Sequence, residues 1–469
     1  MKFYKIIYIT VFFIIISIPF IAMPFYKQHE NTENKVLLEK PELITDGKYN
    51  INYLSELKNW YEEHFAFRQE MVTANALLKG KVFGESSEDL AIVGEDGWLY
   101  LKVSLDDYQG TNLASERRLY NVTRTIYLMQ EYVESLGKTF VFTCAPNKNS
   151  LYPEHMPYYY KVVNDKKNLD TITPMLYEQG INYVDIKKAF LETDEVLYHK
   201  GDSHWNNKGA AMVQNMLLNA AGVDHENFLE KNYELRDDFE GDIDKILYPL
   251  ARHREEEYDY SSYMSYYYTG TDDVTAVNVE THNDSKMGGL LCYRDSFGNS
   301  LLPFLANEFN NADFSKSATY RIDVMAGEDY DVCIIEIVER NLMNITRFAP
   351  VMPAPLRMID GTISDYKSDN STIYWTNFDN YYKISGYVDS DYLSYDSAVY
   401  IRLSNEDYSF TLEAFPVDEG NNDGKTSDYG FTAYLGSNSL PQGIYSVEVI
   451  TKKEDLYHSY MSDDKMDMR

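Results

Sequence analysis

The segment that decides the fold is Gly288-Gly-Leu-Leu-Cys-Tyr-Arg-Asp-Ser-Phe-Gly-Asn-Ser-Leu-Leu-Pro-Phe-Leu305. Its first part, Gly288 to Tyr293, is a short apolar run that predicts a buried strand, and residues 298–308 predict a helix. Ser296 stands at the turn between them, where the backbone N–H groups of a helix start can bind an oxyanion. On this segment alone, a serine that only caps the helix is the commoner explanation.

A second segment, Gly201-Asp-Ser-His-Trp-Asn206, changes that balance. Asp202 precedes His204 by two positions and can accept a hydrogen bond from the imidazole, which would fix its tautomer. An acid, a base and an activatable hydroxyl are the minimum for covalent acyl chemistry. We therefore expect Asp202, His204 and Ser296 to converge. Trp205 is a candidate to line the pocket or stack on a sugar ring, although a tryptophan more often packs in the core.

Two other interpretations of the second segment remain open. Gly201-Asp202-Ser203 spells the nucleophile motif of ordinary GDSL esterases, so Ser203 is a rival nucleophile. It ranks second because side chains of adjacent residues in an extended segment point apart. Metal binding by His199, Asp202 and His204 ranks third because a further ligand is lacking.

Helical and strand patterns alternate through the first 350 residues. Apolar spacing predicts a helix over 119–136 and another over 168–178, and Asn206 or Asn207 is expected to cap a third. Residues 92–101 predict a hairpin that turns at Asp96-Gly97. The remaining buried strands are expected at 138–145, 182–185, 319–325 and 331–338. This alternation is typical of a doubly wound α/β fold with a mostly parallel sheet.

The two ends of the chain have a different character. Ile6 to Phe25 are uncharged and follow Lys2 and Lys5, and about 20 residues span a bilayer core of roughly 30 Å. We expect an uncleaved membrane anchor at 1–26, with a signal peptide as the alternative. The remaining predicted boundaries are a linker at 27–47, a catalytic domain at 48–350, a linker at 351–372, a β-sandwich at 373–460 and a frayed tail at 461–469.

Composition excludes some partners and cofactors. The formal net charge is −31, which argues against nucleic acid because phosphates would be repelled. The three cysteines, Cys144, Cys292 and Cys333, each lie in an apolar run and suggest buried fillers rather than a disulfide scaffold. No metal and no cofactor is expected.

Several segments together resemble the DHHW family and its AlgX/AlgJ-like relatives. These segments are GDSHWNNKGA (201–210), LLCYRDSFGNSLLPFL (290–305), YDVCIIEIVERN (330–341), WYEEHFAFRQEM (60–71), VGEDGWLYL (93–101) and APNKNSLYPEHMP (145–157). The resemblance spans about residues 50–350. It implies an SGNH-hydrolase-like three-layer αβα sandwich, here followed by a β-sandwich domain and preceded by a transmembrane helix. It also implies Ser296 as nucleophile, His204 as base and Asp202 as its orienter.

The resemblance further implies an extracytoplasmic O-acetyltransferase of a cell-surface or exopolysaccharide, supplied by a membrane-bound O-acyltransferase partner. The alternatives are a carbohydrate acetyl-esterase with the same triad and a non-catalytic glycan-binding envelope protein. Asn147 and Lys148 lie in a loop that the family places near the site. Arg294 flanks the nucleophile and Asn299 is a candidate oxyanion donor. The cell membrane, with a single span, is the expected location.

Overall fold

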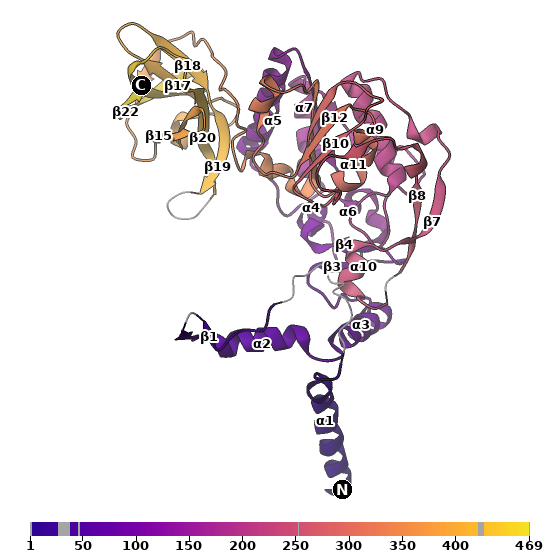
Figure 1. Cartoon of the computed structure of the whole chain (residues 1–469). Coiled ribbons are helices and arrows are strands. Elements are labelled where there is room, and N and C mark those ends of the chain that lie inside the picture. Colours follow the sequence, from indigo (N-terminus) through magenta and orange to yellow (C-terminus); the bar gives the residue numbers. More distant parts are fainter. Residues whose placement is uncertain (1, 27–37, 46, 252, 421–425, 469) are drawn as a thin grey trace.

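The structure is a computed structural model that describes residues 2–26, 38–45, 47–251, 253–420 and 426–468. Figure 1 shows an N-terminal helix that projects from the molecule, an α/β body and a separate β-rich part at the C-terminal end. The central sheet of the body has seven strands in the order β6-β5-β13-β11-β12-β10-β9. These strands are β5 (Thr139–Ala145), β6 (Tyr183–Val184), β9 (Tyr267–Tyr268), β10 (Asn278–His282), β11 (Gly289–Tyr293), β12 (Asn311–Ser315) and β13 (Val332–Val338).

The sheet is mostly parallel, as expected. β6, β5, β13, β11 and β12 run parallel to one another, and only β10 and β9 are antiparallel to their neighbours. Side chains alternate between the two faces along each strand. Phe140 and Phe142 of β5 therefore pack on one face, and Val141 packs on the other.

Helices cover both faces and make three layers. α5 (Glu116–Ser135) and α7 (Asn168–Glu178) pack on the face of Phe142, and α9 (Asn207–Ala221) and α11 (Gly298–Ala306) on the face of Val141. The spans of α5 and α7 agree with the predicted helices. The shorter helices of the body are η2 (Lys102–Ser104), α4 (Leu105–Gln109), α6 (Lys148–Leu151), η3 (Pro153–His155), α8 (Ile186–Leu191), η4 (Phe228–Glu230), α10 (Asp242–Leu247), η5 (Ser261–Tyr263), η6 (Ile322–Ala326) and η7 (Glu339–Thr346).

The strand predicted at 319–325 is wrong. That segment contains the 3₁₀ helix η6, and the strand that pairs with β11 on this side is β12, at 311–315. Ile322 and Met325 are both fully buried. Their spacing of three residues suits a single helical turn that seals the edge of the core, whereas a strand would have turned them to opposite faces.

Two small hairpins complete the body. β3 (Ala91–Val93) pairs with β4 (Leu99–Leu101), and the turn uses Asp96 at φ 54° and Gly97 at φ 82°. The predicted hairpin is therefore confirmed, because Asp and Gly tolerate this left-handed backbone. β7 (Glu234–Phe239) pairs with β8 (Glu255–Asp259), and β8 lies beside α9.

The C-terminal part consists of two facing antiparallel-rich sheets. Their orders are β14-β22-β21-β17-β18 and β15-β16-β20-β19. The strands are β14 (Ile363–Asp365), β15 (Thr372–Phe378), β16 (Tyr381–Tyr387), β17 (Tyr400–Ser404), β18 (Ser409–Glu413), β19 (Phe415–Gly420), β20 (Thr426–Gly436), β21 (Gly443–Lys453) and β22 (Leu456–Met468), with η8 (Ser390–Tyr392) between β16 and β17. Strand β14 falls inside the segment expected to be a linker.

The frayed tail predicted at 461–469 is also wrong for its described residues. Residues 461–468 belong to β22, which pairs with β21 up to Met468. Met466 and Met468 are buried, and the charged Lys465 and Asp467 alternate with them. This alternation is the strand pattern, but the dense charge of the segment hides it.

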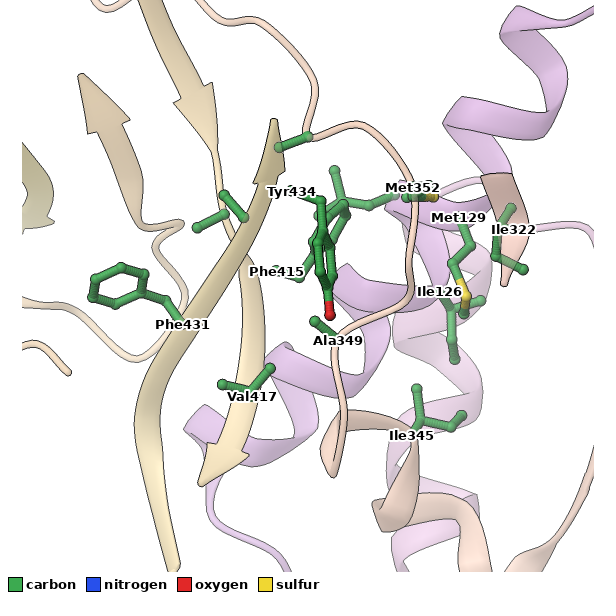
Figure 2. Packing of buried hydrophobic residues seen from close by; sticks show 14 of the residues in the cluster. Ile126, Met129, Ile322, Ile345, Ala349, Met352, Phe415, Val417, Phe431 and Tyr434 are labelled. Carbon is green, nitrogen blue, oxygen red and sulfur yellow. The ribbon is translucent and has the colours of Figure 1, made fainter. Parts of the chain in front are cut away.

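A continuous apolar cluster joins the body to the β-rich part. Figure 2 shows Ile126 and Met129 of α5 on one side and Phe415, Val417 and Tyr434 of the β-sheet on the other. Beside this cluster the Arg124 guanidinium makes two hydrogen bonds, of 2.6 and 2.7 Å, to the fully buried carboxylate of Glu413. The two parts therefore share a core rather than a flexible connection.

The N-terminal region precedes the body. α1 (Lys2–Ala22) includes Tyr4–Ala22, which is long and apolar enough to cross a membrane, a property that signal sequences share. The remaining elements are β1 (Ile44–Thr45), β2 (Lys48–Tyr49), α2 (Tyr53–His64), α3 (Arg68–Leu78) and the π-helix η1 (Lys79–Phe83). Most of the expected linker, residues 27–37 and 46, lies outside the described residues.

Candidate active site

Two chain segments form the site at the carboxyl end of the parallel strands. Ser296 follows β11 and directly precedes α11, whose first residues are Gly298 and Asn299. His204 lies in a loop that a bridge between Tyr198 and Trp205 closes just before α9. The Asn206 side chain caps α9 by accepting a hydrogen bond from Gly209 N–H, which fixes the end of the loop.

The structure brings Asp202, His204 and Ser296 into a continuous hydrogen-bonded series. His204 Nε2 lies 2.8 Å from Ser296 Oγ, and His204 Nδ1 lies 2.7 Å from Asp202 Oδ1. An ionised carboxylate only accepts hydrogen bonds, so Nδ1 carries the proton and Nε2 accepts from the serine hydroxyl. This is the tautomer that a general base needs.

The protonation equilibria of the pair fit that arrangement. Burial by itself would lower the pKa of His204, but the neighbouring Asp202 carboxylate outweighs it, and the pKa is raised above the ordinary histidine value. Burial by itself would raise the pKa of Asp202, but His204 and the N–H groups of Asp242 and His204 hold it well below its usual range. The Asp202 carboxyl is therefore ionised in the folded protein at neutral pH.

The Asp202 carboxylate is held from several sides. Oδ1 accepts from the backbone N–H of His204 at 2.9 Å as well as from its ring. Oδ2 accepts from the backbone N–H of Asp242 at 2.7 Å. Asp242 begins α10, and a Cβ on the preceding Gly241 would meet the Gly201 carbonyl at 2.2 Å. Glycine is thus required for α10 to approach the loop this closely.

Asp242 is a further residue of the site, and the sequence pattern does not predict it. Its carboxylate accepts from Ser203 N–H at 2.7 Å and from Ser203 Oγ at 2.6 Å, and Oδ2 lies 3.8 Å from His204 Nδ1. Asp202, His204 and Asp242 offer ligand atoms within 4.8 Å of one another. These atoms are already occupied by hydrogen bonds within the loop, so the cluster is satisfied without an ion. The only signal in the sequence is Gly241-Asp242, a dipeptide too common to single out.

The rival nucleophile Ser203 faces the other side of the imidazole. Its Oγ lies 3.3 Å from Nδ1, the nitrogen that donates to Asp202, and it donates its own proton to Asp242. Ser203 is also 95 % buried, with an exposed fraction of 5 %. A hydroxyl that donates to a carboxylate and has little access to solvent is a poor nucleophile.

Lys148 and Trp205, two of the expected substrate or oxyanion residues, are both buried and engaged within the protein. Lys148 is buried, and its Nζ donates to the carbonyl oxygens of His199 at 3.1 Å, Lys200 at 2.8 Å and Asp202 at 2.5 Å. Burial lowers its pKa to about 8. Trp205 is fully buried against Phe297 and cannot stack on a sugar. Both residues position the histidine loop.

The other three candidates form a polar shell around the nucleophile turn. Asn147 is buried; its Nδ2 donates to Asp107 at 3.0 Å and its Oδ1 accepts from Arg340 at 3.3 Å. Arg294 is buried as well, and it donates to Asn299 Oδ1 at 2.6 Å and to the Val274 carbonyl at 2.8 Å. The Asn299 oxygen is therefore occupied by Arg294.

The turn that carries Ser296 is fastened to the neighbouring strand. Asp295 Oδ2 accepts from Val338 N–H at the end of β13, and Oδ1 accepts from Phe297 N–H. Among the described residues, no acceptor is bonded to the Ser296 N–H. This free amide beside a helix start is suited to stabilise an oxyanion on an acyl group bound at Oγ.

A cleft of about 620 Å³ lies between the body and the β-rich part, and neither Ser296 nor His204 lines it. Arg340 lines it, and its guanidinium also lies 5.7 Å from the centroid of the Phe297 ring, the residue after Ser296. Further lining groups are the polar or aromatic side chains of Asn112, Arg118, Asn168, Asp428 and Tyr429. The contact between Arg340 and Phe297 has no signal in the sequence, because only the fold brings the two residues together.

Comparisons with known proteins agree with this description. Residues 91–281 match the family model of the SGNH hydrolase-like domain of the acetyltransferase AlgX, a span that includes Asp202 and His204 and ends before Ser296. A comparison with curated proteins finds no significant match.

Several solved structures are similar at low identity. PatB1 of Bacillus cereus is 13% identical with a TM-score of 0.43, over 55% of this chain and 99% of that one. A DHHW family protein of Eubacterium siraeum is 14% identical with a TM-score of 0.39, over 54% and 95%. AlgX of Pseudomonas aeruginosa is 15% identical with a TM-score of 0.35, over 76% and 92%. The family resemblance expected from the sequence is confirmed, in that residues 91–281 match the model of the SGNH hydrolase-like domain of the acetyltransferase AlgX.

Proposed function

We propose that this protein transfers acetyl groups to a polysaccharide outside the cytoplasmic membrane, through an acyl-enzyme on Ser296. The observation that carries the proposal is the 2.8 Å contact between His204 Nε2 and Ser296 Oγ, with Asp202 on the opposite ring nitrogen. An acid, a base and a hydroxyl in this order are the arrangement that activates a serine for acyl transfer.

The proposed reaction has two half-steps. Ser296 Oγ attacks the acetyl carbonyl of the donor while its proton passes to His204 Nε2. The bond to the leaving group of the donor breaks, and that group takes the proton from His204. A sugar hydroxyl then gives its proton to His204 and attacks the carbonyl of the acyl-enzyme. The bond between that carbonyl and Ser296 Oγ breaks, and His204 returns the proton to Oγ, which restores the free serine. The Ser296 N–H stabilises the oxyanion in both half-steps.

The cleft beside Arg340 supports a carbohydrate acceptor. Its lining combines amide, carboxylate and guanidinium groups with the Tyr429 ring, which suits the hydroxyls and apolar faces of sugars. We assign the acyl chemistry to the domain at 48–350 and a role in holding the glycan to the β-rich part that follows. An acetyl-esterase is the second candidate, because the same residues serve it when water replaces the sugar.

The N-terminal helix supports the proposed location of the reaction. We propose that α1 anchors the chain in the cell membrane with the body on the outer side, because Lys2 and Lys5 precede the apolar run and basic residues favour the cytoplasmic side. A membrane-bound O-acyltransferase partner is the proposed source of the acetyl group, by analogy with the family that the chain resembles.

The test is incubation of the full chain with a chromogenic acetyl ester, followed by mass measurement of the intact protein. Wild type and the control Ser300→Ala, one turn further along α11, are expected to show a transient acetyl adduct, and Ser296→Ala is expected to show none. Adding an acceptor oligosaccharide distinguishes the two candidates: acetylated sugar indicates a transferase, and free acetate alone indicates an esterase. An adduct on Ser296→Ala equal to that of wild type would refute the mechanism.

A further inference from the structure

Helix α2 has an apolar stripe that the protein core does not cover. Tyr53, Leu54, Leu57, Trp60 and Tyr61 repeat at three- and four-residue spacing, the pattern of one helical face. Among these residues and the rest of α2 none is buried, and the Leu54 side chain is 78% exposed. An amphipathic helix normally buries its apolar face, so an unburied stripe needs another cover.

The stripe faces the end of the apolar helix α1. The ring centroids of Phe20 and Tyr61 lie 6.2 Å apart. Met23 and Pro24 of the following turn, together with Leu54 and Leu57 of α2, line a groove of about 1030 Å³. The groove therefore begins where the candidate membrane span ends, at Ala22.

The orientation of α2 matches a helix that lies flat on a membrane. Figure 1 shows α2 crosswise to α1, at the end of α1 that leads into the body. A helix perpendicular to a span at this level lies in the plane of the headgroups. Tyr53, Trp60 and Tyr61 supply the amphipathic rings that are enriched at this depth.

The rim of the groove carries basic groups. Lys40 and Lys58 line it, and Lys40 Nζ lies 5.7 Å from the centroid of the Trp60 ring. An apolar floor with ammonium groups at its edge is complementary to a phospholipid, whose acyl chain is apolar and whose phosphate is anionic.

We propose that α2 is an interfacial helix that lies in the outer leaflet with its Leu54 face toward the acyl chains, and that the groove between α1 and α2 holds a phospholipid. This inference rests on the proposed anchor, since α2 reaches the leaflet only if α1 spans the bilayer. Two contacts with the membrane restrict how the body can tilt, and they hold the Ser296 site at a defined height above the donor side of the membrane.

Single-cysteine labelling of the full chain tests the inference. The native cysteines Cys144, Cys292 and Cys333 are buried, so an added surface cysteine is labelled selectively. Leu54→Cys places an NBD fluorophore on the apolar face, and Asn59→Cys is the matched control, since Asn59 is an exposed residue on the polar face of the same helix. Each labelled chain is reconstituted in phosphatidylcholine vesicles that contain lipids spin-labelled on the acyl chain.

The expected result is blue-shifted NBD emission and at least twofold stronger quenching at position 54 than at position 59. Equal emission and equal quenching at the two positions would overturn the inference. Blue-shifted emission at position 54 without lipid quenching would also overturn it, because a protein partner would then cover the stripe. Flotation of the vesicles distinguishes failure of the α2 inference from failure of the proposed anchor. A chain that stays at the bottom of the gradient contradicts the anchor, independently of the fluorescence at positions 54 and 59.

Discussion

The Ser203 hydroxyl donates a 2.6 Å hydrogen bond to Asp242 Oδ2, although Ser203 is the immediate neighbour of His204. This bond directs Ser203 toward α10 and leaves His204 Nε2 to Ser296 alone. The two serines therefore have different roles. Ser203 connects the histidine loop to α10, and Ser296 contacts the base His204. The Gly201-Asp202-Ser203 motif does not reveal these different roles, because the role of Ser203 depends on its hydrogen bond to Asp242.

The first prediction follows from these roles. Ser203→Ala removes one hydrogen bond to Asp242 and leaves the Ser296–His204 contact, so we expect acetyl-ester turnover to fall by less than about tenfold. Ser296→Ala removes the nucleophile, and losses on the order of 10⁴-fold or more are usual for such a change. Steady-state hydrolysis of a chromogenic acetyl ester measures the turnover of both variants against wild type. A larger loss in Ser203→Ala than in Ser296→Ala would reverse the assignment.

The second prediction concerns pH. His204 acts as a base only when neutral, and its pKa is raised above the ordinary histidine value by Asp202. The rate of acylation should therefore fall as pH drops through that raised pKa. Asp202→Asn removes the negative charge, so the acidic limb should move to lower pH while the maximum rate falls by about 10⁴-fold, because the tautomer is no longer fixed.

The measurement is kcat/KM against pH, which reports the free enzyme. Asp194→Asn, a change of the same kind at an exposed residue that lies just before the loop, serves as the control and should leave the profile unchanged. An acidic limb at the same pH in wild type and Asp202→Asn would contradict the coupling of the two residues.

The third prediction concerns Lys148. Its ammonium donates to three carbonyl oxygens of residues 199–202, the segment that leads into Asp202 and His204. Lys148→Met leaves those carbonyls without donors, and each unsatisfied buried group costs about 1–3 kcal/mol. We expect kcat to fall by at least tenfold together with a lower urea midpoint.

Lys200→Met is the matched control for that change. Lys200 is exposed, and its Nζ lies 3.4 Å from the Asp96 carbonyl oxygen and 5.8 Å from the centroid of the Trp98 ring. Its substitution should change stability by no more than about 0.5 kcal/mol. Equal effects of the two substitutions would mean that Lys148 does not position the loop.

The sequence predicts the parts of this fold that have a local signal. The helix at 168–178 and the hairpin at Asp96-Gly97 depend on apolar spacing and turn chemistry within a few residues, and both are found in the structure. The segment 319–325 has an apolar pattern as well, but its neighbours decide its state: β12 takes the place beside β11, and η6 is left to cover the core.

The burial of site residues has no such local signal. Trp205 adjoins His204 in the chain, yet the bridge to Tyr198 turns its ring into the core. Lys148 carries a charge that favours the surface, and only the fold supplies the carbonyl oxygens that make its burial stable. Asp242 lies 40 residues after Asp202. Its backbone N–H donates to the Asp202 carboxylate, and its own carboxylate accepts from Ser203. These contacts are long-range, so a residue pattern cannot reveal them.

The last prediction concerns the junction between the body and the β-rich part. The Glu413 carboxylate is fully buried and accepts from Arg124 of α5 at 2.6 and 2.7 Å and from Arg357 at 2.7 Å. Arg357 also pairs with Glu131 of α5. Removing one member of a buried ionic network leaves the other charges unpaired, which typically costs about 3–5 kcal/mol.

Glu413→Ala should therefore lower the free energy of unfolding by that amount, whereas Glu406→Ala, at an exposed loop residue of the same domain, should change it by less than about 0.5 kcal/mol. Urea unfolding followed by tyrosine and tryptophan fluorescence measures both. Because the network joins the two parts across the Ile126–Phe415 cluster, the cost should appear in the unfolding of the whole molecule. If Glu413→Ala instead yields a separate early transition of the β-rich part, the body and that part do not fold as one unit.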